Sequence, residues 1–132
     1  MSINNEIVDI FLYLKGKCAC SKVEVYHENG FDKENDRFSE DVFGDYLEFG
    51  KVNGRNYYVH KTRNETFGLW WACTGWMLGL DLNKGDCGKG IAYKLSSETC
   101  PEDIVKSGWY YFHVYYWQKA NTSIGIRHEC GM

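Results

Sequence analysis

Histidine and cysteine side chains are the groups in this chain best suited to acid–base and nucleophilic chemistry. The four histidines are isolated in the sequence, and none stands in a Gly-x-Ser-x-Gly or His-Glu-x-x-His motif. A nucleophilic Cys–His pair stays open, because its members need only meet in space, but disulfide bonding would remove it. The sequence therefore predicts a protein that binds a ligand and is not an enzyme.

One set of residues has the donor types for zinc. Cys18 and Cys20, with His128 and Cys130, would supply four ligands. Structural zinc sites usually separate paired cysteines by two to four residues, whereas a single residue separates them here. We expect these cysteines to form disulfides, and we expect no metal and no cofactor.

A second pattern resembles the start of a calcium loop. Asp32, Glu34 and Asp36 alternate along an acidic segment. The required glycine is replaced by Arg37, and the bidentate glutamate is replaced by Phe43. We therefore interpret this segment as a solvated acidic loop.

The cysteine count indicates a disulfide-linked, secreted protein. Six cysteines in a small chain are an even number, which allows fifteen pairings that the sequence does not distinguish. Two N-x-[ST] sequons, at Asn64 and Asn121, agree with glycosylation in a secretory pathway. The expected disulfide cysteines are Cys18, Cys20, Cys73, Cys87, Cys100 and Cys130.

Aromatic residues carry the strongest signal for ligand binding. The segment 109–117 reads as one long strand, on which neighbouring side chains point to opposite faces. The face with Phe and Val is the better core candidate: Tyr110, Phe112, Val114 and Tyr116. Rings with polar atoms, which can stack on a sugar and bond its hydroxyl groups, line the other face. This predicted ligand face consists of Trp109, Tyr111, His113, Tyr115 and Trp117.

The stretch 69–80 contains three more tryptophans. Trp71 shares a strand face with Leu69 and Cys73, which we expect to point inward. Trp70 points the other way, so we expect it either in the ligand-binding surface or beneath a loop. A competing interpretation of the aromatic strand is that it lies between two packed layers with both faces buried.

These side chains must be positioned by short strands. The 132 residues suit one domain, 1–132, and aromatics at 17% with 14 glycines and one proline are typical of strands joined by glycine turns. The clearest turn is Asn53-Gly54, which predicts a hairpin with a type I′ turn. We expect an all-β, antiparallel fold, a sandwich or a small barrel, with a short helical turn and disulfide stabilisation.

Other segments fit this plan. Alternation of Val23 and Val25 with polar residues predicts a strand over 21–28, and two strands meet near Thr74-Gly75. Strands are also expected at 91–96 and 123–130, with a helical turn in 99–109 that begins near a proline. Residues 6–15 fit either a helix or a strand.

Charge and hydropathy exclude two classes of partner. The net charge of −3 argues against sequence-independent binding of nucleic acid, which needs a basic face. No apolar run is long enough to span a bilayer, and no signal peptide is present. These features suit a cytosolic protein or a mature secreted chain, and the cysteines favour secretion to the extracellular space.

A series of short motifs covers about half of the chain: Gly44-x-Tyr46, Asn53-Gly54-Arg55-x-x-Tyr58, Leu69-Trp70, Trp76-x-Leu78-Gly79, Cys100-Pro101-Glu102 and Trp109. With these motifs the chain resembles a family of small, mostly uncharacterised extracellular β-domains found in secreted and matrix proteins of invertebrates and protists. The chain departs from the family's pattern at Asn56-Tyr57, where members often carry a proline. The resemblance implies an extracellular recognition or matrix role and transfers no functional residue.

The sequence thus predicts a secreted binding module that recognises glycans through an aromatic strand face. The rival hypothesis is a structural or protein–protein interaction module of an extracellular assembly. In that hypothesis the aromatic strand contacts a partner protein, or another copy of the chain in a homo-oligomer.

Overall fold

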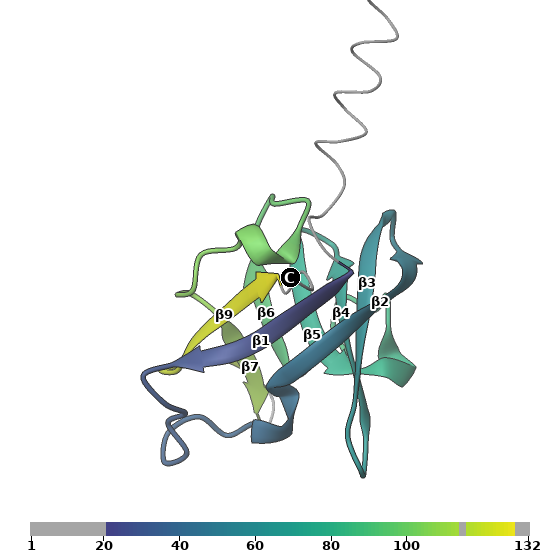
Figure 1. Ribbon diagram of the computed structural model, residues 1–132. Coiled ribbons are helices and arrows are strands. Elements are labelled where there is room, and N and C mark those ends of the chain that lie inside the picture. Colours follow the sequence, from purple (N-terminus) through teal and green to yellow (C-terminus); the bar gives the residue numbers. More distant parts are fainter. Residues whose placement is uncertain (1–20, 114–115, 129–132) are drawn as a thin grey trace, which may run out of the picture.

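The computed structural model describes residues 21–113 and 116–128. The segment 6–15, for which helix and strand were both open, lies outside these residues. Within them the protein is all-β, as the sequence predicts, and its strands form one antiparallel sheet (Figure 1).

Nine strands and three short 3-10 turns make up the described chain. The strands are β1 (Lys22–Glu28), β2 (Gly44–Val52), β3 (Arg55–Lys61), β4 (Thr66–Ala72), β5 (Gly75–Leu80), β6 (Ala92–Leu95), β7 (Tyr110–His113), β8 (Tyr116–Lys119) and β9 (Ser123–His128). The turns are η1 (Glu40–Val42), η2 (Asp81–Asn83) and η3 (Pro101–Asp103).

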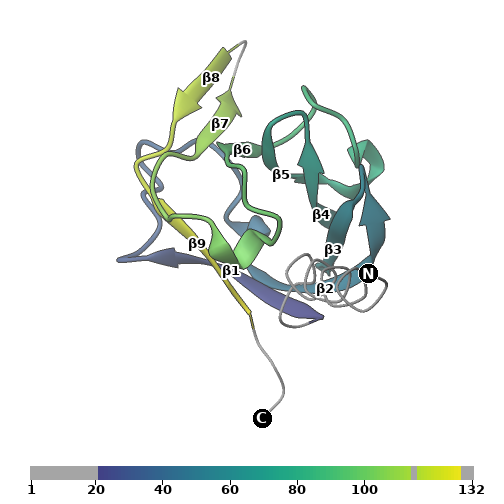
Figure 2. The ribbon, with the colours of Figure 1, turned by 90° about the horizontal axis from the view of Figure 1, so that it is seen from above.

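The sheet is curled into a half-barrel. Its strand order is β8-β7-β6-β5-β4-β3-β2-β1-β9, so every neighbour except the pair β1 and β9 is consecutive in the chain. Figure 2 shows the strands arranged around a curved wall, with β7 and β8 at one end and β1 and β9 at the other. The sequence left a sandwich and a small barrel open, and the structure shows a single curled sheet.

Local sequence signals set several of these elements. Asn53 and Gly54 both have positive φ, 54° and 83°, as a type I′ turn requires. The Asn53 amide donates to the carbonyl oxygens of Trp71 and Gly85, at 2.7 and 3.2 Å, which fixes this turn to the next hairpin. The predicted alternation of β1 and the helical turn at Pro101 are also confirmed.

The main core fills the inside of the curl. Side chains from both ends of the sheet meet there, and η3 packs against β9 beside them. The largest buried members are Tyr46, Tyr58, Phe67, Leu69, Trp76, Leu78, Trp109, Tyr111 and Ile124.

A second, smaller core lies on the outer face of β3 to β5. The loop 81–90 covers it and is held by a disulfide between Cys73 and Cys87. Trp70 is fully buried beneath this loop, where its indole N–H donates to the Asp86 carbonyl oxygen at 3.1 Å. Trp70 therefore belongs to a packed core, and of the two placements that the sequence left open the structure shows the one beneath a loop.

The aromatic segment 109–117 is not one strand. β7 ends at His113 and β8 begins at Tyr116, and the two pair as a hairpin with Phe112 opposite Trp117. Side chains opposite one another project from the same face of a sheet. Trp117 therefore shares a face with Phe112, which corrects the prediction that the two lie on opposite faces.

The prediction of which face of β7 is buried is wrong: the face predicted to bind a ligand is in the core, and the face predicted as core is exposed. Trp109 and Tyr111 are 1% and 2% exposed in the main core, whereas Tyr110 and Phe112 are 41% and 42% exposed. The inside of the curl takes the larger apolar surface of Trp109. It also offers the Tyr111 hydroxyl an acceptor, the Asn35 carbonyl oxygen at 2.8 Å, so that this polar atom is not buried unpaired.

The acidic segment between β1 and β2 is only partly solvated. Asp36 is buried, and its carboxylate accepts hydrogen bonds from the backbone N–H groups of Asn121 and Thr122, at 2.9 and 2.6 Å. The backbone N–H of Asp32 donates to the Thr122 hydroxyl at 3.0 Å. The prediction of a solvated loop is wrong at Asp36, which fastens the segment to the start of β9.

Candidate functional site: an aromatic face on strands β6 to β8

Four aromatic side chains lie together on the outer face of β6, β7 and β8. Cross-strand register places Tyr93 opposite Tyr110 and Phe112 opposite Trp117. The Trp117 ring lies 5.4 Å from Phe112 and 6.2 Å from Tyr93, measured between ring centroids. These contacts make the four rings one continuous surface, which we call the outer aromatic face: Tyr93, Tyr110, Phe112 and Trp117.

Two members of the outer aromatic face carry polar atoms with no internal partner. Within the described part of the chain, neither the Tyr110 hydroxyl nor the Trp117 indole N–H makes a hydrogen bond. Both side chains are at least partly exposed. Their polar atoms are therefore available to a ligand that stacks on the rings.

Hydrogen bonds and a disulfide hold the residues behind this face. The Tyr93 hydroxyl accepts a hydrogen bond from the Thr74 backbone N–H at 3.2 Å and donates to the Ala72 carbonyl oxygen at 3.3 Å. Cys87, fixed by its disulfide, lines the adjacent hollow with Leu95. The hollow has a volume of about 270 Å³, and Tyr93, Tyr110 and Trp117 form the rest of its wall.

A second hollow adjoins the first along β6. It has a volume of about 390 Å³ and shares Leu95 with its neighbour. Its floor is Trp71, over which the Arg55 guanidinium carbon lies 3.5 Å from the ring centroid. Arg55 also donates through Nη1 to the Glu98 carbonyl oxygen at 2.7 Å. The remaining lining residues are Thr74, Ser96 and Ser97.

The structure separates the six predicted ligand-binding residues. Trp109 and Tyr111 are in the main core and Trp70 is in the second core, so none of the three is exposed to a ligand. His113 is half-buried beside Tyr111, with ring centroids 6.5 Å apart, and lies away from the outer aromatic face. Tyr115 lies outside the described residues, and Trp117 is the one predicted residue in the outer aromatic face.

Three members of the face were not predicted as ligand-binding residues. Tyr110 and Phe112 were assigned to the core, and Tyr93 was not singled out. The chain between β7 and β8 is Val114-Tyr115, which carries none of the Gly, Pro, Asn or Asp that mark turns. Missing that break places Trp117 and Phe112 on opposite faces. The assignment of Tyr110 and Phe112 to the core came instead from taking the face with Phe and Val as the inward one.

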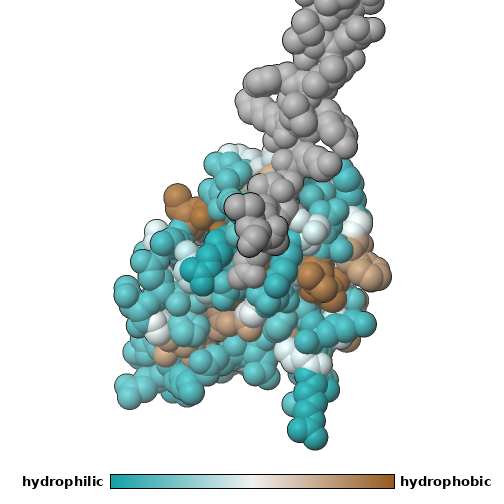
Figure 3. Space-filling view, in the orientation of Figure 1, coloured by the Kyte–Doolittle hydropathy of each residue, from teal (hydrophilic) through white to brown (hydrophobic). Residues whose placement is uncertain are grey.

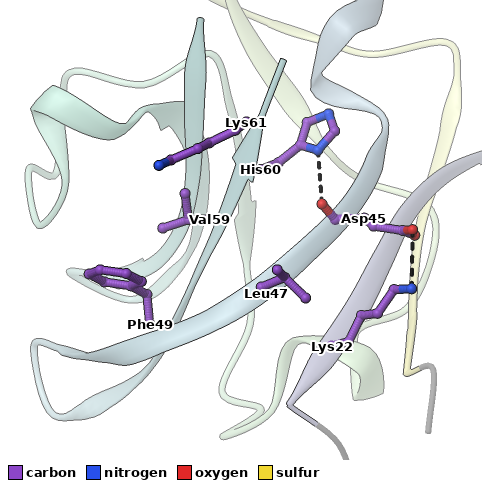
Figure 4. Close-up of a pocket in the computed structure, with 7 residues that line it drawn as sticks. All are labelled: Lys22, Asp45, Leu47, Phe49, Val59, His60 and Lys61. Atoms are coloured by element: carbon purple, nitrogen blue, oxygen red, sulfur yellow. Dashed lines mark hydrogen bonds and ion pairs between the residues drawn. The ribbon is translucent and has the colours of Figure 1, made fainter. Parts of the chain in front are cut away.

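A further hollow lies on the outer side of β2 and β3. It has a volume of about 560 Å³, and Leu47, Phe49 and Val59 form its apolar part (Figure 4). Leu47 is 58% exposed and Phe49 is 74% exposed. Apolar surface is visible on this side of the molecule in Figure 3. Charged side chains at its edge include Asp45, which pairs with Lys22 at 3.3 Å.

The shifted pKa values of four side chains among the described residues follow from their hydrogen bonds or their burial. Hydrogen bonds from Asn35 hold the pKa of Asp32 below its usual range, and backbone N–H groups of Gly88 and Lys89 do the same for Asp86. Burial raises the pKa of Tyr46 and of Tyr58. No group of His, Cys, Asp or Glu side chains suited to a metal ion occurs in the described ranges.

The described residues include three of the six predicted disulfide cysteines and both sequon asparagines. Cys73 and Cys87 are bonded to one another across 14 residues, and Cys100 is also disulfide-bonded. The other three cysteines, Cys18, Cys20 and Cys130, lie outside the described residues. Asn64 and Asn121 are both exposed.

Comparisons of this chain with protein-family profiles, with curated proteins and with solved structures find no match. Among the described residues, no helix is long and apolar enough to cross a membrane.

Proposed function

We propose that this protein is an extracellular glycan-binding module whose binding surface is the outer aromatic face. The observation that carries this proposal is the exposure of Tyr110, Phe112 and Trp117 on one face beside a hollow. Exposed aromatic rings rarely gather on a soluble surface without a binding role.

The chemistry of the face suits a sugar. The apolar side of a pyranose ring stacks on aromatic rings, while its hydroxyl groups need donors and acceptors at the ring edges. The Tyr110 hydroxyl and the Trp117 indole N–H supply these groups. The disulfide at Cys87 and the bonded Tyr93 hydroxyl hold the face in shape before binding, which reduces the entropy lost on association.

Binding to an oligosaccharide array tests the proposal. We expect Tyr110→Ala and Trp117→Ala to weaken binding by about tenfold or more, because each removes a stacking ring. Val105→Ala is the control, since Val105 is an exposed apolar residue outside this face and outside the hollow on β2 and β3. Folding of each variant is checked by its melting temperature. Unchanged binding by both Tyr110→Ala and Trp117→Ala would refute the proposal.

A second candidate function is self-association through the hollow on β2 and β3. Its apolar centre of Leu47 and Phe49 is rimmed by charges of both signs, Asp45 and Lys61, so two copies related by a two-fold axis can be complementary. Sedimentation equilibrium tests this candidate. We expect a dimer that Phe49→Ser dissociates, and a monomeric parent protein would exclude it.

A further inference from the structure

The two hollows meet at Leu95, at the end of β6. Leu95 lines both hollows and is 65% exposed between them. Tyr93 and Trp117 pack against the second core and Trp71 packs against the main core, so the two hollows open on opposite faces of the sheet and adjoin at Leu95. An extended ligand that passes over Leu95 would contact both hollows, whereas a single small ring would fill one.

Arg55 provides a cation in the second hollow. Its guanidinium lies over the Trp71 ring, and one of its donors is used by the Glu98 carbonyl oxygen. A guanidinium has five N–H donors in a fixed plane, so further donors remain for an anionic group. Stacking on Trp71 fixes the plane in which those donors point.

Lys119 provides a cation beside the first hollow. It is exposed on β8 and stands directly opposite Tyr110 in the β7–β8 register. Residues opposite one another in an antiparallel pair have side chains in contact range. A ligand that stacks on Tyr110 therefore lies within reach of the Lys119 ammonium group.

Neither cation is neutralised by a carboxylate. Among the residues that the structure describes, Arg55 and Lys119 form no ion pair. Glu98 meets Arg55 through its backbone carbonyl oxygen. Asp86, the acidic neighbour of Cys87, accepts backbone N–H groups from Gly88 and Lys89 at 2.7 and 2.9 Å.

We infer that the ligand is an acidic oligosaccharide that spans both hollows, with its carboxylate or sulfate groups bound by Arg55 and Lys119. The inference rests on the proposed glycan-binding function and specifies the class of glycan. Stacking rings with cations at both ends suit a chain of sugars that carries anionic groups at intervals. The chain as a whole is acidic, with a net charge of −3, so this attraction is local to the face.

Binding of matched oligosaccharides of equal length tests the inference. The probes are a neutral, a uronate-containing and a sulfated oligosaccharide, with single-stranded DNA as a polyanion without pyranose rings. Each is titrated at about 50 and about 300 mM salt, because screening weakens charge contacts over this range. The variants are Lys119→Gln and Arg55→Gln, and Lys51→Gln is the matched control, an exposed lysine on β2.

We expect at least one acidic oligosaccharide to bind about tenfold or more tightly than the neutral one, and to lose affinity at the higher salt concentration. Lys119→Gln and Arg55→Gln should each reduce that affinity by about two- to fivefold and leave weak neutral binding unchanged. Lys51→Gln should change neither. Melting temperatures report whether Arg55→Gln disturbs the Trp71 contact, and Lys119→Gln, a surface change, gives the result without that complication.

Three results would overturn the inference. Equal binding of neutral and acidic oligosaccharides, with no salt dependence, would refute the acidic class and leave the proposed function standing. Equal binding of single-stranded DNA would show that charge alone recruits the ligand. Binding of no oligosaccharide at all would refute the proposed function and the inference together.

Discussion

Two tryptophans eight positions apart in the aromatic segment differ in burial. Trp109 is buried in the main core, and its indole N–H has no partner there among the described residues. Trp117 is half-buried on the outer aromatic face. Residue type therefore does not decide which of these tryptophans is exposed on the outer face, and strand register does.

Buried and exposed aromatic residues of this segment should differ in how much they contribute to the free energy of unfolding. We expect Trp109→Ala to lower the free energy of unfolding by about 3–5 kcal/mol, because it removes a large buried ring and leaves a cavity. Tyr110→Ala should cost about 1 kcal/mol or less, since its ring is substantially exposed. Urea unfolding followed by circular dichroism measures both values. Equal losses would show that Tyr110 is also part of the core.

Gly54 is the residue on which the β2–β3 hairpin depends. Its φ of 83° is in the left-handed region, which a β-branched residue strongly disfavours. We expect Gly54→Val to lower the free energy of unfolding by about 1–3 kcal/mol. Thermal unfolding is the measurement, with Lys51→Val on the same hairpin as a control for β-branching alone. A parent-like Gly54→Val would mean that another turn geometry is accessible.

The residues that sequence predicts well are those with a local signal. Asn53-Gly54 specifies its own turn, and Val23 and Val25 alternate with polar neighbours, so their positions follow from the chain nearby. From Trp109 to Trp117 every residue is aromatic, histidine or valine. No polar neighbour marks the outer side, and nothing in Val114-Tyr115 marks the break between strands.

At the scale of elements, the loop 81–90 covers the outer face of β3 to β5 and so creates a second core. The segment 81–90 lies over Trp70 and Met77, and the bond between Cys73 and Cys87 ties it there. A Cβ added at Gly90 would clash with the Met77 side chain, which shows how closely the loop approaches β5. The loop is tied down by Cys73 and Cys87, which are 14 positions apart in the sequence. Alternation within β4 alone therefore does not predict that Trp70 is buried.

Removal of this disulfide should loosen the loop. In the double variant Cys73→Ser, Cys87→Ser we expect the free energy of unfolding to fall by about 3 kcal/mol, the value for a loop of this length. Exposure of Trp70 should shift the tryptophan fluorescence of the folded variant to longer wavelength. Circular dichroism of the double variant checks that its sheet is intact. A folded variant with unchanged fluorescence would show that packing alone holds the loop.

At the scale of the whole molecule, the core is rich in buried hydroxyl groups. Tyr46 donates to the Val42 carbonyl oxygen at 2.7 Å, whereas the Tyr58 hydroxyl is buried without a partner in the described residues. Burial raises the pKa of both tyrosines above the usual value of about 10. The folded state thus keeps both tyrosines neutral at a pH where the unfolded chain ionises them.

Stability should therefore fall in alkali. Because the folded pKa values are raised, the stabilisation from neutral Tyr46 and Tyr58 is complete below about pH 10 and is lost as pH rises above it. Absorbance at the tyrosinate band should rise in two stages, first for exposed tyrosines and then together with loss of the circular dichroism signal. Tyr46→Phe and Tyr58→Phe should each move that second stage to higher pH. A single titration near pH 10 with the fold intact would contradict this account.

The central claim is that the outer aromatic face binds a glycan, and the indole N–H signals of the five tryptophans test it directly. Trp70, Trp76 and Trp109 are buried, and the first two donate to the carbonyl oxygens of Asp86 and Glu98. In a two-dimensional ¹H–¹⁵N spectrum, titration with an oligosaccharide that binds should shift the Trp117 signal and leave the Trp70 and Trp109 signals nearly unchanged. A saturating titration in which the Trp117 signal does not move would contradict the claim.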